Sequence, residues 1–116
     1  MRKILIFLML FLPSLCFAAS GVLTAQGNVQ GLPIYKGEKW EVWCSSSKDQ
    51  VELQNWSTSV VIQCKQRGTM SVNGALNYDV YINGNKKCSV WIYVKYNGDQ
   101  IVNVDIKTHY GTTYFK

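Results

Sequence analysis

The sequence contains little of what catalytic, metal-binding or nucleotide-binding sites require. It has one histidine, no glycine-rich loop of the kind that holds phosphates, and no G-x-S-x-G turn of a serine hydrolase. No two cysteines have the C-x2-C spacing of a zinc site. Basic residues occur one or two at a time, which is too sparse for a nucleic-acid-binding stripe. We therefore expect no enzyme activity, cofactor, metal ion or nucleic-acid partner.

Long hydrophobic runs are also missing, apart from one near the start. Two basic residues at positions 2 and 3 precede an apolar run over residues 4–12, which is shorter than the ~20 residues of a membrane-spanning helix. Small residues follow, and this order is typical of a secretory signal peptide that is cleaved after Ala18. We expect a secreted protein, periplasmic or extracellular, with no membrane span. Residues 1–18 are then the signal peptide, and residues 19–116 form a single domain.

The composition of the expected domain favours β-structure. All seven tyrosines and all four tryptophans lie in residues 19–116. Aromatic and β-branched residues favour strands, whereas glycine and asparagine favour tight turns. Alternation of polar and apolar residues predicts strands near residues 39–45, 51–53 and 57–66. Residues 19–33 form either a short strand near Val22–Gln26 or a flexible N-terminal segment.

Asn-Gly pairs divide the second half of the chain into alternating runs, which predicts a meander of β-hairpins. A three-residue loop at Asn83–Asn85 places Val80 opposite Cys88 and Leu76 opposite Ile92. A similar loop at Asn97–Asp99 places Val94 opposite Val102. These registers put the apolar residues on one core face: Leu76, Tyr78, Val80, Ile82, Cys88, Val90, Ile92, Val94, Val102, Val104 and Ile106.

A core face of this kind needs a second layer, which the strands near residues 39–45 and 57–66 supply. The fold class is therefore all-β. We favour a small antiparallel β-sandwich, with a small closed β-barrel as the alternative. Its C-terminal part is a three- to four-stranded meander, in which residues 109–116 add a final edge strand.

Three cysteines remain after removal of the signal peptide: Cys44, Cys64 and Cys88. In an oxidising compartment an odd number predicts one disulfide bond and one leftover thiol. All three are in phase with the apolar side of their strands, so we expect a buried, structural disulfide. The spacing leaves the pairing open. The leftover cysteine is either buried or available to link copies of the chain into a homo-oligomer.

The outer face of the meander is the predicted binding surface. The registers above place Asn77, Trp91 and Asp105 on one rung, and Tyr93 with Asn103 on the next. Tyr81 stands opposite Lys87, and Trp43 is a second candidate exposed aromatic residue. These predicted site residues suit a protein partner, for which Trp and Tyr are usual anchors, or a sugar ring stacked on the indole. Ordinary cross-strand packing of aromatic side chains is the third interpretation.

These observations favour a non-enzymatic binding module that recognises a protein partner through this aromatic sheet face. An inhibitor, an immunity-type protein and a surface accessory protein are all of this kind. Two alternatives stay open. A pilus- or adhesin-like subunit would pair Ala19–Gln26 with the sheet edge of a neighbouring molecule. A carbohydrate-binding module would use the same aromatic face for glycans.

Overall fold

The computed structural model describes residues 17–116, and this part of the chain is built from β-strands without a helix. It therefore includes no helix that is long and apolar enough to cross a membrane. Residues 1–16 of the predicted signal peptide lie outside the described residues. The strands are β1 (Phe17–Thr24), β2 (Lys39–Ser45), β3 (Gln50–Asn55), β4 (Val61–Val72), β5 (Ala75–Ile82), β6 (Asn85–Asn97), β7 (Gln100–Thr108) and β8 (Gly111–Phe115).

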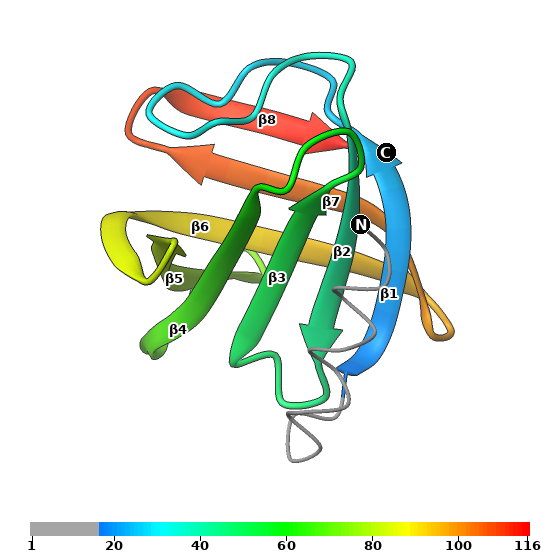
Figure 1. Cartoon of the computed structure of the whole chain (residues 1–116). Helices are drawn as coiled ribbons and strands as arrows, with labels where there is room; N and C mark the ends of the chain where they lie inside the picture. Colours follow the sequence, from blue (N-terminus) through cyan, green and yellow to red (C-terminus); the bar gives the residue numbers. More distant parts are fainter. Residues whose placement is uncertain (1–16) are drawn as a thin grey trace.

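The strands form one continuous sheet that closes on itself. Each strand pairs antiparallel with the next in the chain, from β1 to β8. In addition, β1 pairs in parallel with β7 at Ser20 and Gln100, and the Ser20 amide donates a hydrogen bond to the Asp99 carbonyl (3.0 Å). Strands β1 to β7 therefore form a closed barrel, with β8 as an extra strand beside β7 (Figure 1). The predicted all-β class is confirmed, and the closed barrel replaces the favoured sandwich because the two expected layers belong to one sheet.

Closure of the barrel depends on a close approach at Gly21. A Cβ atom built on Gly21 would lie 2.3 Å from the carbonyl oxygen of Ile101 in β7, far inside the van der Waals contact distance. The backbone of Gly21 is extended, so glycine is needed here for space and not for an unusual φ angle. Only a residue without a side chain allows β1 to lie against β7 at this point.

The predicted register of the first hairpin is confirmed. Val80 faces Cys88 and Leu76 faces Ile92. The loop itself differs from the prediction, because it has two residues, Asn83 and Gly84, both with positive φ (53° and 80°) as a type I′ turn requires. A bulge between Val80 and Tyr81 compensates for the shorter loop, so the core pairs are unchanged.

The predicted register of the second hairpin is wrong by two residues. Val94 faces Val104 and not Val102. Two differences of one residue each add up. The loop has two residues, Gly98 and Asp99, and not the predicted three, because Asn97 pairs with Gln100. A bulge on β7 then leaves Val102 as an extra residue opposite β6. Consequently Ile101 is buried in the core while Val102 is only half-buried. The other ten residues of the predicted core face are all in the core cluster or packed against it.

The three cysteines lie on one rung of the barrel, where they alternate with valines. Cys44 faces Val51, Val51 faces Cys64, Cys64 faces Val80, and Val80 faces Cys88. Neighbouring cysteines are thus two strands apart, about 9 Å at the usual strand spacing. A disulfide bond needs Cα atoms closer than about 7 Å. All three cysteines are free, and the predicted disulfide bond is absent.

Residues 19–33 contribute to the sheet and to the core. Of the two alternatives for this segment, strand and flexible tether, the structure has strand β1, which pairs with β2 along its length. Beyond β1, Ala25 bridges to Phe115 of β8, and the side chains of Val29, Leu32 and Ile34 are buried. This loop, drawn in cyan at the top of Figure 1, runs beside β8.

Candidate functional site

A groove of about 660 Å³ lies on the outer face of the meander. Its floor comes from β6, β7 and β8, and one wall comes from the end of the β4–β5 hairpin. We call it the aromatic groove, defined by its lining residues: Val72, Asn73, Ala75, Trp91, Tyr93, Asp105, Lys107, Thr112 and Tyr114. Its volume is within the range of ~300 to 1,000 Å³ typical of ligand-binding pockets.

The floor of the groove consists of two neighbouring rungs. One rung carries Trp91, Lys107 and Thr112, and the next carries Tyr93, Asp105 and Tyr114. Directly opposed residues on one face of a sheet have Cβ atoms about 5 Å apart. The Asp105 carboxylate therefore projects between two tyrosine side chains, one on each neighbouring strand. Both tyrosines are exposed (41% and 51%) and available to a ligand.

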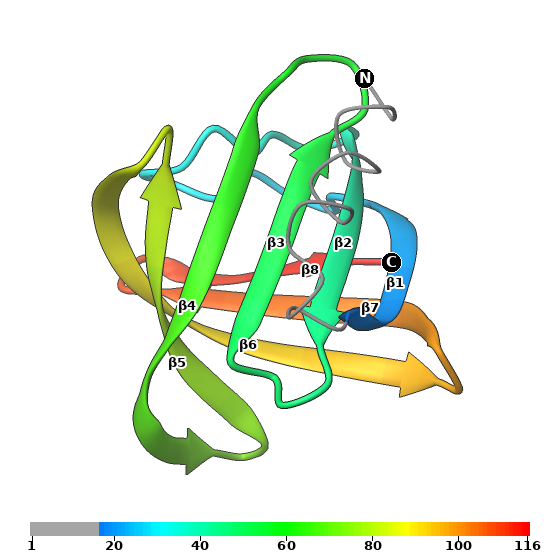
Figure 2. The ribbon, with the colours of Figure 1, turned by 60° about the horizontal axis from the view of Figure 1, so that its bottom comes forward.

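The wall of the groove is the part of the β4–β5 hairpin that extends past β3, residues 67–76, which we call the hairpin arm (Figure 2). β3 pairs with β4 only as far as Lys65. The arm turns at Asn73 and Gly74, whose φ angles of 52° and 83° fit a type I′ turn. A Cβ atom on Gly74 would lie 3.0 Å from the Tyr93 ring, so the turn packs closely beside this ring.

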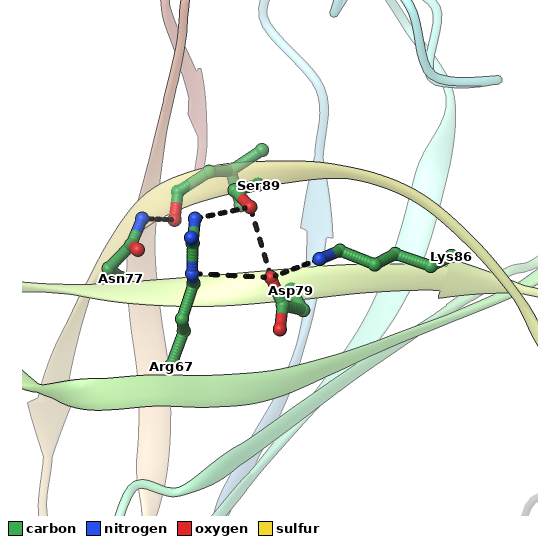
Figure 3. A network of polar contacts seen from close by, with 6 residues as sticks. Arg67, Asn77, Asp79, Lys86 and Ser89 are labelled. Carbon is green, nitrogen blue, oxygen red and sulfur yellow. Dashed lines mark hydrogen bonds and ion pairs between the residues drawn. The ribbon is translucent and has the colours of Figure 1, made fainter.

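Asp105 is an unpaired carboxylate. Within residues 17–116 it makes no hydrogen bond or ion pair, and partial burial raises its pKa. Asp79, on the same outer face, does have partners. It accepts a hydrogen bond from Ser89 (3.0 Å) and lies near Lys86 (3.4 Å) and Arg67 (3.9 Å), as Figure 3 shows.

The pKa of Asp79 reflects these partners. Desolvation raises it, but the hydrogen bond from Ser89 and the two cations outweigh that effect and lower the pKa below its usual range. The charge of Asp79 is therefore compensated within the sheet, whereas that of Asp105 is left for a ligand.

The structure brings three of the predicted site residues together, namely Trp91, Tyr93 and Asp105. Asn77 lies on the rung of Trp91, but its side-chain amide donates to the Val90 carbonyl (3.0 Å) and it does not line the groove (Figure 3). Asp105 belongs to the rung of Tyr93 and not to that of Trp91, because the shorter loop and the bulge on β7 together shift the register by two residues.

The other predicted site residues lie elsewhere. Asn103 pairs with Lys95, beyond the groove. Tyr81 pairs with Lys86 and not with Lys87, which is the bulged residue, and the ammonium group of Lys65 lies 5.2 Å from the centre of its ring. Trp43, which pairs with Ser20 of β1 and Glu52 of β3, is buried (6% exposed), contrary to the predicted exposure.

Sequence reasoning did not assign Lys107, Thr112, Tyr114 and the arm residues to the site. Thr112 and Tyr114 alternate in the predicted final strand, so that strand's register with β7 was the signal that could have placed them. The arm residues had no such signal, because their position depends on how far β4 extends beyond β3.

The described residues hold no group of three or more His, Cys, Asp or Glu side chains that could bind a metal ion. The aromatic groove instead supplies three aromatic side chains, one carboxylate, one ammonium group, an amide and a hydroxyl. Comparison of the chain with protein-family models, curated proteins and solved structures finds no match. The chemistry of the groove is therefore the basis for a functional assignment.

Proposed function

We propose that this protein is a secreted, non-enzymatic binding module that recognises a protein partner through the aromatic groove. The aromatic rung of Tyr93, Asp105 and Tyr114 carries this proposal, because exposed tyrosines beside a carboxylate form an anchor site that is open to solvent. Trp and Tyr supply large contact areas at low cost in conformational entropy, and they dominate the energetics of protein interfaces.

Aliphatic side chains on the hairpin arm favour a protein over a glycan as the partner. Met70 and Val72 are exposed (69% and 48%), and Val72 lines the groove together with the aromatic side chains. Such side chains form no hydrogen bonds with sugar hydroxyls, whereas they extend the apolar contact that a protein partner would bury. Together with the groove they form an exposed apolar patch of the kind that marks interaction surfaces.

The alternative of a structural subunit gains no support from the position of Ala19–Gln26. Strand β1 pairs with β2 along its length. At its end Thr24 exchanges two backbone hydrogen bonds with Lys116, and the Gln26 amide donates to the carbonyl of Tyr114 in β8. Pairing of this segment with another molecule would require these bonds to break first.

Capture of partners from the native source tests the proposal. A photo-crosslinking residue replaces Thr112 on the groove floor, and the captured species are identified by mass spectrometry. We expect Tyr93→Ala and Tyr114→Ala to abolish crosslinking of a defined protein. The matched control is Tyr35→Ala, which removes an equally exposed tyrosine (56%) outside the groove.

Two results would overturn the proposal. One is an unchanged crosslinking pattern in both groove variants when their thermal stability matches that of the wild type. The other is a shift of the groove amides in NMR spectra on titration with glycans, with no protein captured.

A further inference from the structure

The groove floor carries two opposite charges on a single strand. Asp105 and Lys107 are two positions apart on β7 and both line the groove. Side chains at positions i and i+2 of a strand share one face and are about 6.8 Å apart. The same spacing occurs in any extended peptide, so a bound strand-like segment could match both charges with alternate side chains.

Neither charge is neutralised within the described chain. Asp105 makes no ion pair or hydrogen bond there, and Lys107, which is exposed, makes none either. The two side chains are therefore not paired with one another. Asp79 lies on the same face of the sheet, but its charge is balanced by two cations and a hydrogen bond from a serine.

The aromatic side chains beside Asp105 indicate which kind of cation a ligand would place there. Tyr93 and Tyr114 flank Asp105 on the neighbouring strands, so a cation bound at Asp105 would also contact the faces of two tyrosine rings. Arginine suits this position better than lysine, because its planar guanidinium stacks on aromatic rings and donates two parallel hydrogen bonds to a carboxylate. Lys107 on the next rung would then attract a carboxylate.

We infer that the aromatic groove binds an extended segment of a partner protein, with an arginine over Asp105 and an acidic residue two positions away over Lys107. This inference rests on the proposed function, because it specifies the partner that the same groove recognises. The charge pattern has no preferred chain direction, since a segment that runs either way along β7 presents the same two side chains.

Synthetic peptides in which only the charged positions differ test this inference at low ionic strength. Arg-x-Glu has the proposed spacing, and Arg-x-x-Glu places the two charges on opposite faces of an extended chain. Arg-x-Arg serves as a charge control. Binding is followed by NMR shifts of the amides of Tyr93, Asp105 and Tyr114. We expect Arg-x-Glu to bind about tenfold more tightly than the other two peptides, the effect of one charge-assisted pair.

Charge reversal on the protein provides the matched test. In Lys107→Asp both charged positions of the groove, 105 and 107, are acidic, so the preferred peptide should change from Arg-x-Glu to Arg-x-Arg. Asp105→Asn should weaken binding of Arg-x-Glu about tenfold, as expected for loss of one charged partner. Equal affinity for the Arg-x-Glu and Arg-x-x-Glu spacings, or an unchanged preference in Lys107→Asp, would overturn the inference.

The outcomes separate this inference from the proposed function. If Tyr93→Ala and Tyr114→Ala abolish capture of a protein while the peptides show no preference, the proposed function stands and the charge pattern is rejected. If glycans and not peptides shift the groove amides, both are rejected.

Discussion

Substitution of Gly21 by alanine tests whether the barrel depends on contact between β1 and β7. The added Cβ atom would start 2.3 Å from the Ile101 carbonyl oxygen, so β1 must move away from β7 by about an ångström to reach ordinary contact. The nearby hydrogen bond from the Ser20 amide to the Asp99 carbonyl, now 3.0 Å long, should weaken as the strands separate.

The expected destabilisation follows from three terms. Overpacking at a tight site costs about 1 to 3 kcal/mol, and loss of one hydrogen bond costs about 1 kcal/mol. Alanine restricts the unfolded chain and so offsets about 0.4 to 1 kcal/mol. Together these terms give a net loss of about 1 to 3.5 kcal/mol in the free energy of unfolding. For a domain of about 100 residues this lowers Tm by roughly 5 to 25 °C.

Urea unfolding followed by tryptophan fluorescence, together with a thermal melt, measures this loss. Gly27→Ala is the matched control, because its Cβ atom would meet only the Thr113 methyl group at 3.8 Å and its φ is not positive. The control should change stability by less than about 0.5 kcal/mol or increase it slightly. Equal stability of the two variants would refute the assigned role of Gly21 in closing the barrel.

The thiols, the Tyr78 hydroxyl and the Asp105 carboxylate each offer a separate test. Alkylation of the denatured, unreduced protein should modify Cys44, Cys64 and Cys88, and in the native protein these sites should react slowly because burial raises the pKa of each thiol; a disulfide found by mass spectrometry would contradict the structure. Tyr78→Phe removes a buried donor to the Lys48 carbonyl (2.6 Å) and should cost about 1 to 2 kcal/mol in urea unfolding. Burial raises the pKa of Asp105, so its carboxylate form is disfavoured in the folded state. The stability of the wild type should therefore fall relative to Asp105→Asn as the pH rises through that pKa, and the dependence should vanish below the ordinary Asp pKa of 3.8; a difference that is constant with pH would contradict this.

Local patterns determined most of what could be predicted from the sequence. The alternation in β5 and β6 indicated which side chains are buried and which of them face each other, although the Asn-Gly loop is one residue shorter than predicted and a bulge restores the core pairs. The register of β7 could not be derived in the same way. Ile101 and Val102 are both apolar, so alternation does not reveal which of them is the bulged residue.

Long-range geometry accounts for the remaining differences. Barrel closure depends on the approach of Gly21 to Ile101, two residues far apart in the sequence, and composition does not distinguish this glycine from a turn glycine. The disulfide prediction failed for a related reason. The alternation of apolar residues correctly placed all three cysteines on the inner side of their strands. The distance between them, however, depends on the order of the strands in the sheet.

The candidate site was predicted only as far as the alternation extended. Trp91, Tyr93 and Asp105 all lie on the expected outer face. The hairpin arm, which converts that face into a groove, is positioned by the length of β4 relative to β3, and this cannot be read from either strand alone.

The alternation of cysteine and valine around one rung of the barrel has a consequence for biogenesis. The finished barrel keeps its thiols apart, so its stability owes nothing to oxidation and the chain should refold in a reducing buffer. The unfolded chain has no such protection, since any two of Cys44, Cys64 and Cys88 can meet in it. In an oxidising compartment, barrel closure therefore competes with the formation of non-native disulfides. Faster folding leaves less time for such disulfides to form, and so it should increase the yield of the closed barrel.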